Sequence, residues 1–128
     1  MIILYILAGI VGLFFLAQFT LIWKMKRQKG KPAPSLPGAP GERIRTGERA
    51  IFYFFSPQCG ACRSMTPVVE DLAKEHREVF PVDISQQFEI ARKFGVMATP
   101  SMVIVEDGKI QDYLIGPQTP AYVRGLVQ

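Results

Sequence analysis

The sequence is poor in the residues that build metal centres and disulfide frameworks. Its 128 residues include two cysteines, one histidine and one tryptophan. A small secreted scaffold usually needs several disulfides, so two cysteines separated by two residues exclude that class of protein. Structural zinc usually takes four ligands, and a cysteine pair with a single histidine falls short of that set. Cys59 and Cys62 are therefore predicted to be a working pair rather than a structural staple.

Charge is missing from the N-terminal segment. No charged side chain occurs between Ile2 and Trp23, where Gln18 and Thr20 are the only clearly polar residues. At about 1.5 Å per residue, a helix of this length spans the roughly 30 Å hydrocarbon layer of a bilayer. A cleaved signal peptide is disfavoured, because positive charge before the apolar run and a small-residue cleavage site are both lacking. We predict a single-pass transmembrane anchor at residues 1–23, in contact with membrane lipid.

The net charge of +4 is concentrated beside this anchor. Residues 1–47 carry seven basic residues and one acidic residue, whereas residues 48–128 carry eight basic and ten acidic residues. The second part is slightly acidic, so no nucleic acid is expected as a partner, and the basic cluster suits anionic lipid head groups. Five Lys and Arg residues lie within eight positions after Trp23. The positive-inside rule therefore predicts that the chain after the anchor is cytoplasmic.

Residues 24–47 are expected to form a basic juxtamembrane segment and a Pro/Gly-rich linker. Four prolines between Gln28 and Glu42 disfavour helix and favour an extended spacer. At about 3.1 Å per residue, such a spacer would hold the following domain several tens of ångströms from the bilayer. The domain itself is expected at residues 48–128.

Beyond the linker, strand-like and helix-like patterns alternate. The expected strands are Ala50–Phe55, Val79–Ile84, Ser101–Val105 and Lys109–Ile115, the last two joined by an Asp107-Gly108 turn. The expected helices are Gly60–His76, Ser85–Phe94 with Ser85 as its cap and Gly95 as its end, and a short last helix opening at Thr119-Pro120. The resulting order, β-α-β-α-β-β-α, is that of a minimal α/β domain.

The segment Cys59-Gly60-Ala61-Cys62 follows an apolar strand and opens a helix. A thiol at a helix N-terminus faces unpaired N–H groups and the positive end of the helix dipole, which stabilise thiolate over thiol. Cys59 is therefore the expected nucleophile. Cys62, one helical turn further along, is placed to resolve the mixed disulfide that Cys59 forms with a substrate.

These residues resemble the thioredoxin superfamily, over about Ala50 to Gln128. The strand AIFYFF leads into SPQCGAC, Pro67 stands where the family's active-site helix is kinked, and Thr99-Pro100 is similar to its cis-proline loop. Gly116 matches the glycine that follows the last strand. The resemblance implies a minimal thioredoxin-like fold that exchanges disulfides with protein thiol and disulfide substrates, and the predicted anchor would tether it to the membrane. It implies no cofactor, no metal, and an unidentified electron donor or acceptor.

The resemblance also implies which residues touch a substrate. The family's equivalent of Pro100 adopts a cis peptide bond opposite the cysteine pair and exposes backbone with which an extended substrate segment pairs. Met97 and Ala98 would extend that surface. The implied substrate-binding residues are Gln58, Gly60, Ala61, Thr99 and Pro100.

Four positions depart from thioredoxin itself. Gln58 replaces the tryptophan before the first cysteine, and Ala61 replaces the proline of CGPC. Tyr53 and Pro81 stand where thioredoxin has a buried aspartate and its partner lysine. The acid–base pair that assists the resolving cysteine is therefore missing as a unit. Proline within a strand is tolerated chiefly at a sheet edge, so Pro81 also predicts that the second strand is an edge.

Several alternatives stay open on the sequence alone. A thioredoxin-like domain also serves as a non-catalytic adaptor, and C-x-x-C is also the ligand spacing of copper and zinc sites. Reductases, oxidases and isomerases share one machinery and differ in redox potential and electron partner. A cytoplasmic domain would meet a reducing pool and act as a reductase. Membrane-tethered relatives that work on the oxidising side keep a periplasmic or extracytoplasmic location open.

Overall fold

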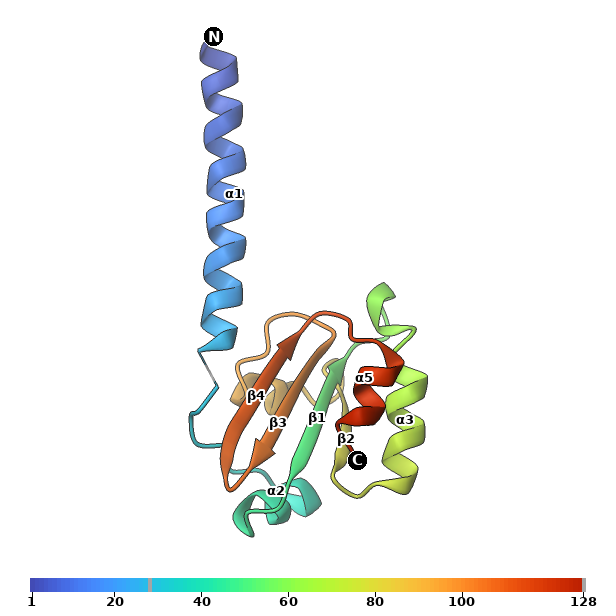
Figure 1. Ribbon diagram of the computed structural model, residues 1–128. Coiled ribbons are helices and arrows are strands. Elements are labelled where there is room, and N and C mark those ends of the chain that lie inside the picture. Colours follow the sequence, from blue (N-terminus) through green and yellow to red (C-terminus); the bar gives the residue numbers. More distant parts are fainter. Residues whose placement is uncertain (28, 128) are drawn as a thin grey trace.

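The computed structural model describes residues 1–27 and 29–127, which form one long helix and a domain built on a four-stranded sheet (Figure 1). The strand order is β2-β1-β3-β4. β1 (Ala50–Phe55) runs parallel to β2 (Val79–Asp83) and antiparallel to β3 (Ser101–Glu106), and β4 (Lys109–Ile115) runs antiparallel to β3. The predicted order of strands and helices is confirmed, and so is the position of the Pro81 strand at a sheet edge.

β1 is the central strand, and helices cover both of its faces. Because successive side chains of a strand point to opposite faces, its apolar run divides between two cores. Phe52 and Phe54 pack with Phe94 after α4 (Phe88–Lys93), on one face. Ile51 and Tyr53 pack on the other face, which α3 (Thr66–Glu75) and α5 (Pro120–Gly125) cover. The unbroken hydrophobic run thus reflects burial on both sides.

The helix expected at Gly60–His76 is divided in the structure. A short 3₁₀ turn, η1 (Gly60–Cys62), is followed by α3, which begins at Thr66. Pro67 lies in the first turn of α3, where its missing N–H leaves no intrahelical bond unmade. Proline is tolerated at that position and disrupts a helix interior. The prediction of one continuous helix is therefore wrong at its N-terminal end.

The second predicted helix also begins later than expected. α4 starts at Phe88, because Ser85 does not cap it. The Ser85 hydroxyl and amide donate instead to the Asp83 carboxylate, over 2.6 and 2.9 Å, which closes a local turn of the kind that aspartate favours. Two other predicted helix boundaries, at Gly95 and at Thr119, are confirmed. Gly95 follows α4 with φ of 70°, and the Thr119 hydroxyl accepts from the Tyr122 amide at the start of α5.

The expectation of an extended spacer from Gln28 to Glu42 is wrong for its described part, which begins at Lys29. The chain runs along β4, where the Gly30 amide donates to the Ile110 carbonyl over 2.7 Å and the Ala33 amide to the Gly108 carbonyl over 2.9 Å. The helix α2 (Gly38–Arg45) comes next. An uncovered sheet edge offers hydrogen-bond partners to extended backbone, and Pro40 falls in the first turn of α2, where proline is tolerated.

Apolar side chains from residues 24–47, the predicted juxtamembrane segment and linker, belong to the domain core. Met25, Leu36 and Ile44 are 1%, 4% and 8% exposed and pack in the same cluster as Phe52 and Phe54. The core therefore continues across the boundary expected at residue 48. A covering segment of this kind is not visible in local sequence patterns, because its partners lie far along the chain.

Replacing Leu36 with alanine is expected to lower the free energy of unfolding by about 2–4 kcal/mol, since it leaves a cavity in the core. Urea unfolding of the full-length chain in detergent micelles, followed by circular dichroism, measures the loss. Phe88→Ala is the matched control, because Phe88 is 62% exposed and its truncation should cost within about 0.5 kcal/mol. Equal losses in the two variants would show that Leu36 is not part of the core.

The helix α1 (Ile2–Lys26) extends away from the sheet (Figure 1). It is the one helix among the described residues that is long and apolar enough to cross a membrane. Its large apolar side chains are exposed from Ile2 to Ile22, except the half-buried Leu21. A membrane span and a signal sequence both have this pattern. At its C-terminal end, the Arg27 guanidinium lies 4.2 Å from the centre of the Trp23 ring.

Candidate active site at the end of the central strand

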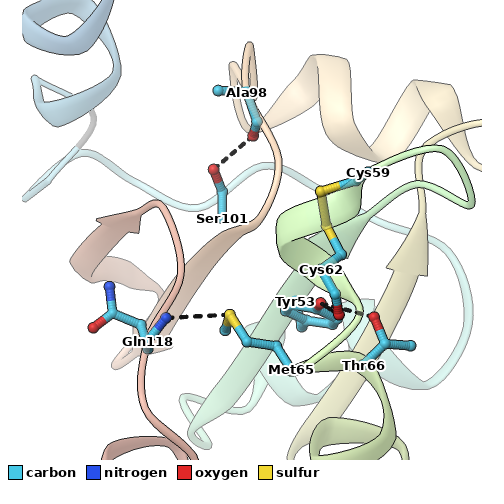
Figure 2. The surroundings of a disulfide bond; sticks show 8 residues. All are labelled: Tyr53, Cys59, Cys62, Met65, Thr66, Ala98, Ser101 and Gln118. Carbon is cyan, nitrogen blue, oxygen red and sulfur yellow. Dashed lines mark hydrogen bonds between the residues drawn. A yellow bond between two sulfur atoms is a disulfide. The ribbon is translucent and has the colours of Figure 1, made fainter.

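Cys59 and Cys62 form a disulfide just after β1 (Figure 2). Their Cα atoms are 5.3 Å apart, and the Cys62 amide donates to the Cys59 carbonyl over 3.3 Å. Cys59 caps the η1 turn and is partly exposed, whereas Cys62 is 2% exposed. The sequence places Cys59 at the start of an α-helix, but the structure places it at a 3₁₀ turn that precedes the helix. The disulfide nevertheless has one accessible and one buried member.

Tyr53 lies beneath the disulfide, at the position where thioredoxin has its buried acid. Its hydroxyl is 2.9 Å from the Thr66 Oγ1 and 3.4 Å from the Cys62 carbonyl oxygen (Figure 2). Burial raises the pKa of the Tyr53 phenol; the hydrogen bond with Thr66 opposes this shift and the Glu70 carboxylate adds to it. A phenol that keeps its proton is a hydrogen-bond donor and not a base at neutral pH.

The two residues that stand in place of the acid–base pair are neighbours in the sheet. Tyr53 of β1 is the register partner of Pro81 of β2. A lysine at position 81 would therefore have stood beside an acid at position 53. In this chain neither of the two neighbouring positions carries a charge.

The loop before β3 lies at the same end of the sheet as the disulfide. Ser101, its first strand residue, is the register partner of Phe54 in β1. The Thr99–Pro100 peptide bond is cis. The Ser101 hydroxyl donates to the Ala98 carbonyl over 2.7 Å (Figure 2), and the Gly116 amide donates to the Pro100 carbonyl over 2.9 Å. These bonds fix the loop from both sides.

The backbone of Thr99 is left free by this arrangement. Within residues 1–27 and 29–127, no hydrogen bond involves the amide or the carbonyl of Thr99. Pro100 is buried, Thr99 is partly exposed, and Met97 is 54% exposed. Gln58, Gly60 and Ala61 are exposed around Cys59. The structure thus brings the predicted substrate-binding residues to one end of the sheet, and their contact with a substrate stays a prediction.

Three residues that sequence reasoning missed support the site. The Thr66 hydroxyl is hydrogen-bonded with the Tyr53 hydroxyl. The Met65 sulfur accepts a hydrogen bond from the backbone amide of Gln118 over 3.2 Å, which joins the start of α3 to the loop after β4 (Figure 2). Nothing in their local sequence points to these contacts, because each depends on where a distant element packs.

A cleft beside the disulfide is lined by Phe55, Ser56, Pro57, Cys59, Cys62, Arg63, Thr66 and Pro67.

The single histidine lies away from the cysteine pair. His76 caps the C-terminal end of α3, and its Nδ1 is 3.5 Å from the Glu78 carboxylate. In the described part of the chain, no three His, Cys, Asp or Glu side chains are grouped in a way that would hold a metal ion. The metal-binding alternative gains no support from this geometry.

Comparison with known proteins decides the family. The family model described as Thioredoxin matches residues 42–127, which include β1, the cysteine pair and all later elements. The chain belongs to the thioredoxin family. Its thioredoxin domain carries the close cysteine pair of a thiol-disulfide oxidoreductase, and thioredoxins act on protein thiols and disulfides without a cofactor.

Individual thioredoxins match most of their own length. Thioredoxin of Bacillus subtilis is 32% identical over 77 residues, which are 58% of this chain and 74% of that protein. A thioredoxin H-type protein of Fagopyrum esculentum is 31% identical over 96 residues, 73% of this chain and 72% of that one. The X-ray structure of Fasciola hepatica thioredoxin superposes with a TM-score of 0.55 and 37% identity, covering 67% of this chain and 86% of its own.

Iodoacetamide is expected to alkylate Cys59 at least about tenfold faster than Cys62 in the reduced, full-length chain at neutral pH. The reason is access, because Cys59 is partly exposed and Cys62 is 2% exposed. Brief exposure, denaturation and peptide mass spectrometry measure both rates, with the unfolded chain as the control for equal access. Equal or faster alkylation of Cys62 would contradict the assignment of Cys59 as the attacking thiol.

Proposed function

We propose that this protein is a membrane-tethered oxidoreductase in which Cys59 attacks protein disulfides and Cys62 resolves the mixed disulfide. The observation that carries the proposal is the unequal burial of the two cysteines in a thioredoxin-family domain. Only the partly exposed Cys59 is open to the sulfur of a protein substrate. Cys62, 2% exposed and already within bonding distance of Cys59, reacts inside the molecule.

The exchange is a balanced two-electron reaction. In the reducing direction, the Cys59 thiolate attacks one sulfur of the substrate disulfide, a mixed disulfide forms and the first substrate thiolate leaves. The Cys62 thiolate then attacks Cys59, the second substrate thiolate leaves, and each substrate thiolate takes up a proton. The protein ends with the Cys59–Cys62 disulfide and needs a dithiol donor to return to the reduced form. The oxidising direction is the reverse, with a disulfide acceptor.

The substrate edge is formed by the loop before β3. The unbonded amide and carbonyl of Thr99 offer one donor and one acceptor to an extended segment, in the manner of an added strand. Pro100 holds the loop beneath this edge, and Gln58, Gly60 and Ala61 surround the attacking sulfur. None of these five residues carries a charge, and the nearest charge on the cleft beside the disulfide is Arg63.

The tether is α1, and lipid is its partner. One feature supports a retained membrane span over a cleaved leader: Met25 at the end of α1 is buried in the domain core, and residues 30–33 are hydrogen-bonded along β4. The basic residues after Trp23 suit anionic head groups and, by the positive-inside rule, support a cytoplasmic domain. In that compartment the protein acts as a reductase.

Reduction of insulin tests the proposed activity. The full-length chain in detergent micelles, supplied with dithiothreitol, is expected to accelerate precipitation of the insulin B chain well above the dithiothreitol background. The control is the variant in which Cys59 and Cys62 are both serine, which should equal the background. Equal rates for the two proteins would favour the non-catalytic adaptor.

A single cysteine at Ser35 tests the side of the membrane. In a Cys59→Ser, Cys62→Ser background, Ser35→Cys is expected to resist a membrane-impermeant maleimide in intact cells and to react fully after lysis. Ser35 is exposed, and its carbonyl, which accepts from the Lys93 ammonium, is unaffected by the substitution. Gel-shift of the labelled chain gives the reacted fraction. Full reaction before lysis would place the domain outside and favour disulfide formation, isomerisation or cytochrome maturation.

A further inference from the structure

The four loops at the disulfide end of the sheet contain one charged residue. β1 and β2 run parallel and both end there, β3 begins there, and β4 ends there. The loops at this end are residues 56–65, 84–87, 94–100 and 116–119, and apart from Arg63 they consist of apolar, small or uncharged polar residues. The nearest flanking acid is Asp83, whose carboxylate already accepts two hydrogen bonds from Ser85.

The opposite end of the same sheet is rich in charge. The connections there are residues 46–49, 76–78 and 107–108, and they include Glu48, Arg49, Arg77, Glu78 and Asp107. The contrast does not follow from the need to bury a core, because loop tips at either end of a sheet face the surroundings. It indicates that the two ends meet different surroundings.

The proposed membrane helix leaves the domain at the disulfide end (Figure 1). From Gly30 to Ala33 the chain runs along β4 from Ile110 towards Gly108, so α1, which precedes it, lies on the side of the disulfide end. Met97 of the loop before β3 lines a groove together with Leu13, Leu16, Ala17, Thr20, Leu21 and Lys24 of α1. The tip of that loop is therefore level with the C-terminal part of the apolar span.

The charges that flank this contact suit a phosphate-rich layer. Lys24, Arg27 and Lys31 line a second groove with Gly95 and Met97 of the same loop. Trp23 lies under the Arg27 guanidinium, and tryptophan and arginine are both favoured at the head-group level of a bilayer. If residues 2–23 cross the bilayer, the exposed Met97 side chain reaches the interface, and the disulfide end of the domain faces the lipid.

We infer that the substrates of the Cys59–Cys62 pair are integral membrane proteins whose reactive disulfides lie at the bilayer surface. The inference rests on the proposed function, both for the exchange reaction and for α1 as a membrane span. The attached β4 segment and the buried Met25 hold the domain against α1, so the pair is presented at one height. A substrate disulfide far from the bilayer would meet the opposite end of the domain, away from Cys59.

Substrate height tests this inference. The full-length chain is reconstituted in phospholipid vesicles, reduced, and mixed with vesicle-inserted transmembrane peptides that carry one cysteine as a mixed disulfide with thionitrobenzoate. One peptide has this cysteine at head-group level, and the other has it beyond a ten-proline spacer of about 31 Å. Release of thionitrobenzoate is expected to be at least about tenfold faster from the first peptide. Equal rates would overturn the inference.

An insertion variant supplies the matched control. Twelve Gly/Ser residues added after Arg27, together with Met25→Ser, separate α1 from the segment that lies along β4 and remove the side chain of α1 that is buried in the core, so the domain becomes free to turn. The expected result is that the preference for the head-group peptide falls to about onefold to twofold, since flexible linkage removes the fixed height. A preference that survives the insertion would overturn the inference. Failure of both proteins to reduce even the soluble 5,5′-dithiobis(2-nitrobenzoate) would instead contradict the proposed function.

The orientation itself is read from two tryptophans at opposite ends of β2. In a Trp23→Phe background, Gln86→Trp reports the disulfide end and Arg77→Trp the far end; both native residues are exposed. Vesicles containing phosphatidylcholine with a nitroxide on its head group are expected to quench Gln86→Trp at least twofold more than Arg77→Trp. Equal quenching, or stronger quenching of Arg77→Trp, would overturn the orientation. A chain that does not partition into vesicles at all would contradict the tether.

Discussion

Replacing Cys59 with serine is expected to lower disulfide reduction by at least about three orders of magnitude, because a hydroxyl does not replace the thiolate as nucleophile or as a partner in a disulfide. Cys62→Ser is expected to lower steady-state turnover to a similar degree by a different route. Its first step remains, since Cys59 still attacks, but the mixed disulfide has no internal thiol to resolve it.

The two variants are distinguished by what they retain. Cys62→Ser should accumulate substrate proteins bound to Cys59 through a reducible bond, whereas Cys59→Ser should accumulate none. Non-reducing gels of each full-length variant, trapped in acid and probed before and after dithiothreitol, measure the adducts. Adducts in Cys59→Ser at the level of Cys62→Ser would reverse the roles of the two cysteines.

Introducing the acid that thioredoxin has beneath its cysteine pair is expected to destabilise this protein. Tyr53 is fully buried, and its neighbour across the sheet is Pro81, which has no charge to compensate a carboxylate. Tyr53→Asp also empties the volume of the phenol ring and removes its hydrogen bond with Thr66. We expect a loss of at least about 3 kcal/mol in the free energy of unfolding. This loss of stability is expected to outweigh any gain in the rate of disulfide exchange.

The pH dependence of this loss separates charge from volume. Burial holds the pKa of the introduced carboxyl above its value in the unfolded chain, so stability falls as the pH rises above about 4, where only the unfolded state ionises freely. Tyr53→Asp should therefore melt lower at pH 8 than at pH 5. Tyr53→Phe is the control, because it keeps the ring, costs about 1 kcal/mol for the lost hydrogen bond, and adds no such dependence. Unchanged melting of Tyr53→Asp, with faster exchange, would show that the site accommodates the acid.

Local sequence was sufficient for the strands and for two helix boundaries. β1 and β4 occupy the predicted residues, and Gly95 and Thr119 act as predicted, because each depends on side chains within a few positions. Ser85 shows the limit of such reasoning. It has the chemistry of a helix cap, but Asp83, two residues earlier, takes both of its donors. Local competition of this kind is decided by backbone geometry that the sequence pattern does not contain.

The prediction of a free linker differs most from the structure. Four prolines and three glycines indicate a free spacer, and the chain forms no helix between Lys31 and Leu36. Whether an extended segment hangs in water or lies along a sheet depends on an open edge elsewhere. Here β4 supplies that edge, and the core accepts Leu36. The segment expected to keep the domain away from the bilayer instead fixes it against α1.

The sequence by itself determined the chemistry: two cysteines at the spacing of a redox pair, after an apolar strand and before a helix, with an uncharged span ahead of them. These are properties of residue type and spacing along one stretch of chain. Only the tertiary structure decided which cysteine is accessible, that Tyr53 and Pro81 are neighbours, and that the disulfide and α1 share one end of the sheet. Such relations join residues tens of positions apart, and strand direction and packing set them.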